Sequence, residues 1–430
     1  MKKIFLFVVF SVMLLSLWGC NSSTQSQNHE ATIEQAASTN RPFITKWQGT
    51  AGKELRIPIL GTYTLTWYNE ATPEERYTEQ VSITSYIGKH EFEETTPYTF
   101  TTPTDGVYVV EAGPEGVEGM LMLFDNAEIF SMKLLSVVQF GDVIWKRLQS
   151  AFHNCSDMRF EEGIDIPNLS QCTNLSWMFA GCESFNHPLE SWDVSQVTLM
   201  TGMFAGCRSF NQPLAKWNVS NVTNMGGMFY WCSSFNQPLG KWDVSKVTNM
   251  SNMFDGCSAF NQDISGWNVS NVGNMASMFR GCKRFNQPLE KWDVCKVTNM
   301  SNMFHGCSAF NQPLAKWNVS NVTNMGGMFY WCSSFNQPLG KWDVSNVTNM
   351  SNMFRGCTLF NQSLEIWKIT PFAYSNGMRG MFFGTPAAEL PFVAKWCAAG
   401  CQLGEDDVFL PADDTNYYFI YESIENATKE

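Results

Sequence analysis

The sequence predicts a repeat solenoid whose coils each contain a short strand and a short helix, preceded by a small all-β domain. A phenylalanine recurs every 25 residues from Phe185 to Phe360, and a tryptophan keeps the same step from Trp192 to Trp367. Eight copies without an insertion indicate supersecondary units that bury a core only by stacking on one another. Short alternating runs of apolar and polar residues between 41 and 136 indicate the β domain.

The helix in each coil is predicted from the spacing inside one copy, residues 235–259. Apolar residues from Val247 to Cys257 recur at steps of three or four, which would place them on one face of about three helical turns. Ser245 or Thr248 could cap the start of that helix, because a hydroxyl accepts from the free amides of the first turn. The residues before Val247 lack this period and are predicted to be extended.

The run WDVSNVTNMSNMF, at residues 342–354, resembles the roughly 25-residue repeat of bacterial surface lipoproteins related to the BspA-like leucine-rich-repeat surface proteins. The resemblance covers about residues 172–368. It implies a leucine-rich-repeat-like solenoid on a cell surface, with adhesion or partner binding as its role. It carries over no catalytic residue.

The N-terminus has the features of a secretory signal. Lys2 and Lys3 precede an apolar run that ends in Leu-Trp-Gly-Cys at residues 17–20. This ending resembles the lipobox of bacterial lipoproteins, which implies a signal peptide over residues 1–20 and a lipidated Cys20. We therefore expect a lipid-anchored protein at the cell surface, in the outer membrane; the alternative is a secreted protein without lipid.

Composition sets the remaining domain boundaries. Residues 21–40 are rich in Ser, Thr, Gln and Asn and are predicted to be a flexible tether. Residues 41–136 are predicted to form a β-sandwich-like domain. An N-cap of the solenoid over 137–181 leads into the eight repeats at 182–367, and 368–430 is predicted to be the C-terminal cap.

Charge and motifs argue against several classes of function. The net charge of −12 argues against a nucleic-acid binder. The five histidines are scattered, and the sequence contains no HExxH, GxSxG or phosphate-loop motif. We therefore expect no enzyme, no cofactor and no metal site. One alternative is a carbohydrate-acting N-terminal domain, for which Glu74, Glu75, Glu93 and Glu94 are the available carboxylates.

The cysteine three residues before each repeated phenylalanine is predicted to belong to a buried structural ladder. Stacked side chains about 4.8 Å apart are too far apart for the Cβ spacing of roughly 3.5–4.5 Å in a disulfide, so free thiols are expected. The ladder consists of Cys182, Cys207, Cys232, Cys257, Cys282, Cys307, Cys332 and Cys357. Off the ladder lie Cys155, Cys172, Cys295, Cys397 and Cys401, and a disulfide between the last two stays open.

Two aromatic pairs break the repeat pattern. Residues 210–254 and 310–354 are identical at 44 of 45 positions, and each block carries a Tyr-Trp pair where most coils have another residue followed by glycine. We predict that Tyr230, Trp231, Tyr330 and Trp331 are ligand-binding anchors. The alternative is local packing against the next coil.

Together these features favour a lipid-anchored bacterial surface protein whose solenoid presents a binding face. The expected partners are the membrane, through the lipid, and a protein or glycan of a host or neighbouring cell. An alternative is a structural spacer or variable surface antigen without a specific ligand.

Overall fold

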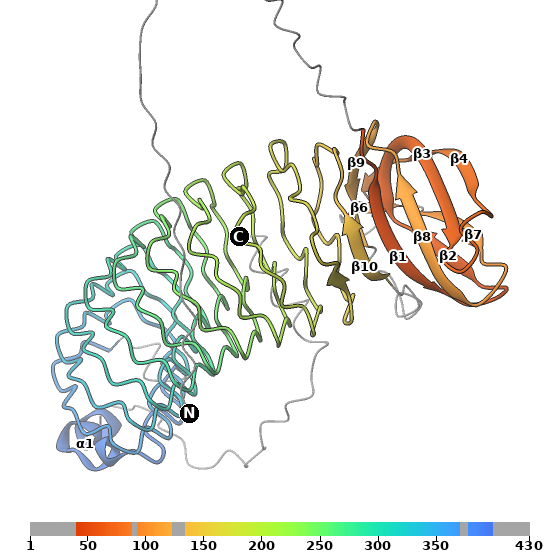
Figure 1. Cartoon of the computed structure of the whole chain (residues 1–430). Coiled ribbons are helices and arrows are strands. Elements are labelled where there is room, and N and C mark those ends of the chain that lie inside the picture. The colour runs from red at the N-terminus through yellow and green to blue at the C-terminus, as the bar shows by residue number, and fades with distance from the viewer. Residues whose placement is uncertain (1–39, 88–92, 96, 123–133, 370–376, 399–430) are drawn as a thin grey trace, which may run out of the picture. The chain divides into compact units, whose positions relative to one another are not determined.

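The computed structural model describes residues 40–87, 93–95, 97–122, 134–369 and 377–398 (Figure 1). The side chains of residues 85–87, 93–95, 397 and 398 are also outside this description. Cys20, residues 21–39 of the predicted tether and Cys401 lie outside the described residues.

The N-terminal part is built on one seven-stranded mixed sheet with the strand order β11-β10-β1-β8-β3-β4, in which β9 also pairs with β3. Its pairs are antiparallel except β10 with β11, which is parallel. Its strands are β1 (Phe43–Gly49), β3 (Ile59–Asn69), β4 (Tyr77–Ile83), β8 (Gly106–Ala112), β9 (Val117–Met120), β10 (Leu134–Gln139) and β11 (Arg159–Phe160).

Two further ribbons accompany this sheet. They are β2 (Glu54–Ile57) with β7 (Tyr98–Thr101), and β5 (Ser85–Ile87) with β6 (Glu93–Thr95). Side chains alternate between buried and half-buried along β1, because successive residues of a strand point to opposite faces. Trp67 of β3 stacks on Phe100 of β7 at 3.9 Å between ring centroids. The predicted β-sandwich is therefore wrong: the described strands form one large mixed sheet and two two-stranded ribbons.

The repeats form a stack of coils that lie side by side (Figure 1), but the predicted coil structure is wrong. Each coil consists of tight turns, and successive coils are joined by a single parallel bridge residue, as between Asn249 and Asn274. Among the described residues the helices are η3 (Pro386–Glu389) and α1 (Pro391–Ala398), both beyond the repeats. No coil contains a helix, so this is not a strand-plus-helix, leucine-rich-repeat-like solenoid.

The backbone hydrogen bonds explain why the helical spacing gives no helix. Every second amide donates to a carbonyl of the next coil, as Asn252 does to Ala276 at 2.8 Å and Phe254 does to Met278 at 2.9 Å. The amides between them close turns on the carbonyl three residues earlier, as Asp255 does on Asn252 at 3.1 Å. An α-helix would use each of these amides for a bond within the coil.

Residues with left-handed backbone conformation separate these turns. Asn252 has φ 55° and Gly256 has φ 77°. A left-handed residue at every fourth position ends each helical turn, because a right-handed helix cannot continue through it. Apolar residues at steps of three and four then face inward from consecutive turns. The expected caps at Ser245 and Thr248 are not made; the amide of Ser245 donates to Asp243 Oδ1 at 3.0 Å.

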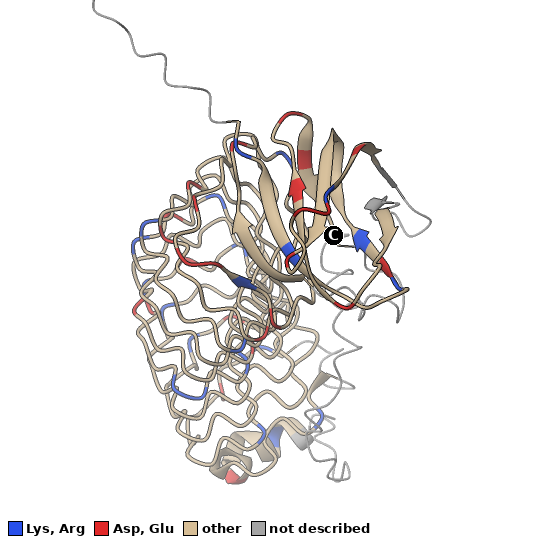
Figure 2. Ribbon diagram, turned by 45° about the vertical axis from the view of Figure 1, so that its right-hand side comes forward, with Lys and Arg blue, Asp and Glu red and all other residues tan. Residues whose placement is uncertain are grey.

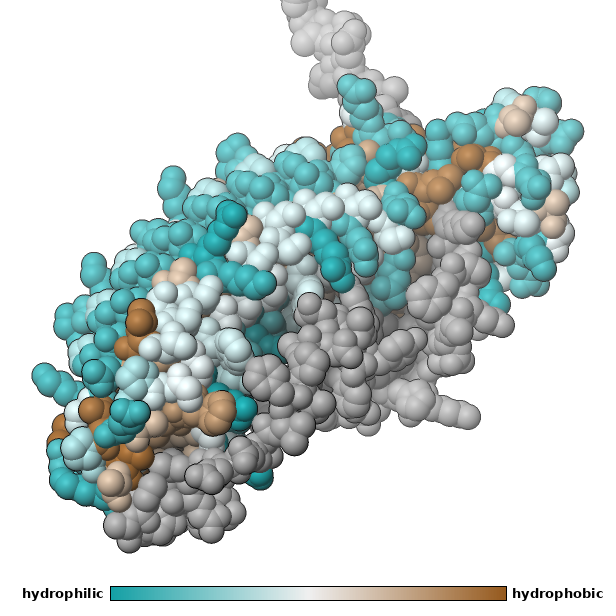
Figure 3. Space-filling model, turned by 90° about the horizontal axis from the view of Figure 1, so that it is seen from below, coloured by the Kyte–Doolittle hydropathy of each residue, from teal (hydrophilic) through white to brown (hydrophobic). Residues whose placement is uncertain are grey.

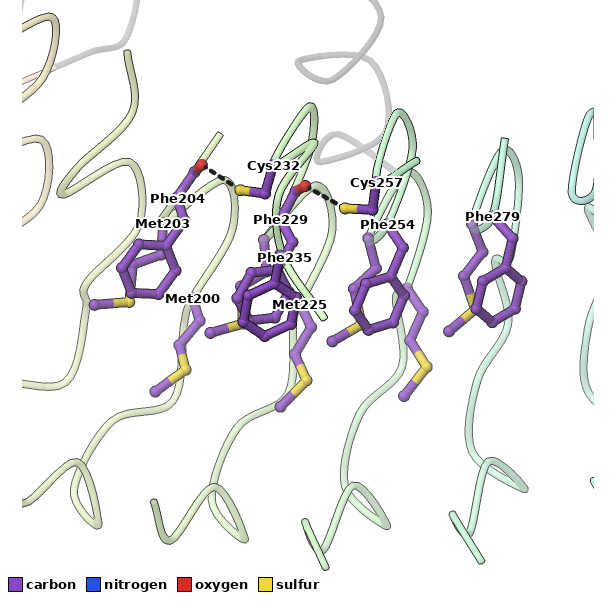
Figure 4. Close-up of a cluster of buried hydrophobic side chains, with 14 of the residues drawn as sticks. Met200, Met203, Phe204, Met225, Phe229, Cys232, Phe235, Phe254, Cys257 and Phe279 are labelled. Carbon is purple, nitrogen blue, oxygen red and sulfur yellow. Dashed lines mark hydrogen bonds between the residues drawn. The ribbon is translucent and has the colours of Figure 1, made fainter. Parts of the chain in front are cut away.

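The interior of the stack is a set of columns of like side chains (Figure 4). The rings of Phe229, Phe254 and Phe279 lie nearly parallel, with centroids 5.6 and 5.8 Å apart. Within each coil a second phenylalanine stacks on this column, as Phe260 does on Phe254 at 4.1 Å. Two methionines per coil fill the remaining space and are fully buried, such as Met250 and Met253.

Both ends of the stack are covered by other parts of the chain. At its start, the amide of Met120 in β9 donates to the carbonyl of Arg147 at 3.1 Å, and Phe140 packs edge-on against Trp192 at 5.6 Å. At its end, Phe392 and Trp396 of α1 pack against Phe382 at 6.0 and 6.2 Å. An uncovered end would expose a full layer of aromatic rings to water.

Candidate functional site

The two residues that follow the column phenylalanine form two parallel rows along the stack. The first, called the variable row, changes its chemistry from coil to coil; the second, called the glycine row, is glycine in seven coils and tryptophan in two. The variable row is Ala180, Ala205, Tyr230, Asp255, Arg280, His305, Tyr330, Arg355 and Phe383. The glycine row is Gly181, Gly206, Trp231, Gly256, Gly281, Gly306, Trp331, Gly356 and Gly384.

The glycine row requires a left-handed backbone. Its glycines have φ between 70° and 77°, while Trp231 has φ 56° and Trp331 has φ 59°. A bulky side chain in this region is an outlier that costs about 1–2 kcal/mol. The stack is built equally well with glycine here, as seven coils demonstrate. A tryptophan held in this conformation where glycine suffices is an outlier that motivates a functional hypothesis.

Each tryptophan lies over the glycine of the next coil. A Cβ added to Gly256 would come 3.1 Å from Cγ of Trp231, and one added to Gly356 would come 3.4 Å from Cδ2 of Trp331. The geometry therefore supports both interpretations of the aromatic pairs, which are packing against the next coil and contact with a ligand. The rings touch the next coil, yet the side chain of Trp331 is 53% exposed. The guanidinium of Arg208 lies 5.6 Å from the Trp231 ring centroid; the corresponding residue near Trp331 is Ser308.

Side chains of the variable row contact one another along the stack. Arg280 Nη1 lies 3.7 Å from Oδ2 of Asp255. The rings of His305 and Tyr330 are 4.5 Å apart, and the guanidinium of Arg355 lies 4.7 Å from the ring of Phe383. Burial, with a smaller effect of Arg280, lowers the pKa of His305 to about 4, so its imidazole is neutral at pH 7.

The backbone beneath both rows is fixed. The amide of Trp231 donates to the carbonyl of Asp255 at 2.6 Å, that of Gly256 to Arg280 at 2.7 Å, and that of Trp331 to Arg355 at 2.8 Å. Coil after coil the same bond recurs, so each side chain projects from a position set by its neighbours. A ligand that contacts several coils would meet a preorganised surface and would cost little ordering of the protein.

Asp255 is a buried carboxylate in this surface. Its exposed fraction is 3%, and burial raises its pKa from 3.8 to about 7 against the opposing effect of Arg280. The raised pKa means that Asp255 favours folding while it is protonated. That contribution is complete below about pH 4 and is lost as the pH rises through about 7.

We expect Asp255→Asn to be more stable than the parent at pH 8 and about equal to it at pH 4. A shift of about three pKa units corresponds to at most roughly 4 kcal/mol when Asp255 is fully ionised. Thermal or urea unfolding at both pH values measures the difference. A stability difference independent of pH would show that Asp255 does not titrate in this range.

The ladder cysteines take part in the contacts between coils and are all buried. The thiol of Cys232 donates to the carbonyl of Phe204 at 2.9 Å, and that of Cys257 donates to Phe229 at 2.9 Å (Figure 4). Burial raises the pKa of the Cys257 thiol well above its ordinary value. Cys295 is half-buried, and the side chains of Cys397 and Cys401 are outside the described residues. A thiol held in this way is a hydrogen-bond donor of the scaffold.

The asparagine that follows each repeated phenylalanine forms a further ladder along the stack. Oδ1 of Asn211 accepts from the amide of Asn236 at 2.9 Å and from Nε2 of Gln237 at 3.1 Å, and the pattern repeats in later coils. These asparagines are half-buried or exposed. Their carbonyl oxygens therefore satisfy backbone amides of the next coil.

The carboxylates available to a carbohydrate-acting domain are not gathered in the described structure. Glu74 and Glu75 are exposed in the turn between β3 and β4. The side chains of Glu93 and Glu94 lie outside the described residues. Within the described ranges, no group of three or more His, Cys, Asp or Glu side chains could hold a metal ion.

The comparisons with known proteins place the repeats in a family. The family model described as Mycoplasma protein of unknown function, DUF285, matches residues 146–245, 237–320 and 287–396, which together make up more than half of the chain. The chain belongs to the DUF285 family. The match begins near the first coil and ends within α1, so the family is defined by the stack. No curated protein and no solved structure matches the chain.

The described part of this DUF285 chain contains no helix that is long and apolar enough to cross a membrane. Charged residues are sparse on the coils and do not form one continuous field (Figure 2). The face shown in Figure 3 is mainly hydrophilic, with hydrophobic patches toward the end of the stack that carries α1. Exposed apolar residues of these last coils include Leu359, Ile366 and Phe383.

Proposed function

We propose that this chain is a lipid-anchored surface protein that binds a partner through the variable and glycine rows of its solenoid. The observation that carries the proposal is the left-handed conformation of Trp231 and Trp331 at positions where glycine suffices. Tryptophan supplies a large rigid surface at low cost in side-chain entropy and is enriched among the residues that dominate binding energy.

Two anchors in one stack support binding at several points. Trp231 and Trp331 lie four coils apart, about 20 Å at the spacing of stacked strands. A partner that engages both gains from the second contact by effective concentration, so weak contacts add up to useful adhesion. This fits the adhesive role implied by the resemblance to bacterial surface lipoproteins.

The experiment that tests the proposal is a binding measurement with the purified full chain on an array of glycans and extracellular matrix proteins. Saturable binding to at least one member is expected. Absence of saturable binding across the array, with the protein folded by circular dichroism, would favour a spacer or antigen instead.

The anchor is tested separately. We expect mass spectrometry of the protein from bacterial membranes to show an N-terminal Cys20 carrying lipid, because the apolar run and Leu-Trp-Gly-Cys resemble a lipobox. Cys20→Ser should release the protein from the membrane fraction. An unmodified N-terminus at another residue would refute the lipid anchor without affecting the binding proposal.

A further inference from the structure

Several cationic residues lie on the turns that carry the two rows. Both rows as far as Gly356, together with the two residues after each ladder cysteine, form a strip that runs from Ala180 to Leu359. It contains five cationic residues and two carboxylates, whereas the whole chain has a net charge of −12. The cations are Arg208, Arg280, Lys283, Arg284 and Arg355.

Both carboxylates of the strip are already paired. Glu183 lies 3.9 Å from Arg208, and the buried Asp255 lies 3.7 Å from Arg280. Lys283 and Arg284 are exposed and project from one coil, between the coils of Trp231 and Trp331. The strip therefore offers an aromatic face, a cluster of cations and a second aromatic face in that order.

We propose that this strip binds an anionic polysaccharide, with sugar rings on the two tryptophans and acidic groups on Lys283, Arg284 and Arg280. The inference rests on the proposed function and gives it a ligand class. The apolar C–H face of a sugar packs on a flat aromatic ring, and cations bind sulfate or carboxylate groups of the same chain. Contacts spread over about 20 Å suit a linear polymer that runs along the stack.

Other anionic polymers fit this surface less well. Single-stranded nucleic acid binds by stacking successive bases on successive aromatic side chains. Here the three coils between the tryptophans have Gly256, Gly281 and Gly306 at that position. A peptide that binds by adding a strand needs a free backbone edge. The amides of the glycine row already donate to the next coil, as Gly281 does to His305 at 2.7 Å.

The sibling coils supply variants that preserve the fold. Lys283→Ser with Arg284→Ala recreates Ser308 and Ala309 of the following coil, so this double variant should fold as the parent does. Arg280 stays unchanged, because its removal would leave Asp255 buried without its cation. The matched control, Lys241→Ser with Lys291→Ser, removes the same charge from another row, where Ser191 stands in a sibling coil.

The test measures binding of the full chain to heparin, dextran as a neutral polysaccharide, polyglutamate and a single-stranded oligodeoxynucleotide, at low and at physiological salt. We expect heparin to bind most tightly and to weaken with salt, because exposed charges are screened. The strip variant should lose roughly tenfold in affinity for heparin, as expected for two exposed ion pairs, while the control pair changes it less than twofold.

Each other outcome overturns the inference. Equal binding of dextran would remove the role of charge, and equal binding of polyglutamate or the oligonucleotide would remove the preference for a glycan. An equal loss in the control pair would place the site elsewhere. Saturable binding of a neutral glycan or a protein, with heparin ignored, would overturn this inference and leave the proposed function standing. Failure to bind any of these ligands would overturn this inference, and the array result would then decide the proposed function.

Discussion

Replacing both Trp231 and Trp331 by glycine is expected to abolish partner binding while the chain stays as stable as the parent. A tryptophan anchor typically contributes 2 kcal/mol or more, so each loss should weaken binding at least about 30-fold. If one ligand spans both rings, the double variant should lose roughly a thousandfold. Surface plasmon resonance with the ligand found on the array measures this.

The stability half of this prediction separates a binding residue from a packing residue. Glycine relieves the left-handed strain of about 1–2 kcal/mol, which offsets the lost contact with the next coil and the greater freedom of the unfolded chain. The free energy of unfolding should therefore stay within about 1 kcal/mol of the parent. Ile366→Lys, which restores the residue of sibling coils at a side chain that is 72% exposed, controls for general loss of apolar surface. Undiminished binding with both tryptophans gone would refute the site.

Phe254→Ala is expected to be the most damaging single change in the repeats. Its ring contacts Phe229 and Phe279 in neighbouring coils and Phe260 in its own. Truncation removes this buried surface and leaves a cavity that rigid coils cannot close, at a cost of about 3–5 kcal/mol. Urea denaturation measures the loss.

The damage should also be local, because each coil contacts only its neighbours. Hydrogen exchange should rise most in the coil of Phe254 and in the two coils beside it. Phe383→Ala is the control: that ring is 54% exposed, and its loss should cost less than about 1 kcal/mol. A loss of similar size in both variants would contradict the column as the source of stability.

The stack could be predicted from the sequence, but the structure of a coil could not. A fixed period of 25 residues admits few architectures other than stacked units. The steps of three and four from Val247 to Cys257 fit a helix and a series of consecutive turns equally well. The spacing alone therefore cannot distinguish the two structures. A discriminating signal was present in the row that contains Asn252, where sibling coils have Gly202, Ser277 and Gly327. Glycine and asparagine in the middle of an apparent helix mark a left-handed position.

The candidate site was only partly visible in the sequence. Tyr230, Trp231 and their copies stand out because sibling coils have other residues. The glycines at the equivalent positions of sibling coils indicate a left-handed backbone, which is strained for tryptophan, but only once the turn itself is known. A third left-handed tryptophan, Trp177 with φ 60°, belongs to the other left-handed row, where sibling coils have Gly202 and Gly227. The contacts of Asp255, Arg280 and His305 join residues 25 apart, which only the stacking brings together.

Every coil forms the same backbone hydrogen bonds with the next, and this regularity has a genetic consequence. Residues 210–254 and 310–354 are nearly identical, and where their coding DNA is equally similar, homologous recombination can join the two segments. A crossover between the two deletes four coils and joins surfaces whose amides and carbonyls already match. The product keeps one Tyr-Trp pair, lacks Lys283 and Arg284, and retains a continuous core. The number of coils and of Tyr-Trp pairs can thus change in a single inherited step without passing through a misfolded protein.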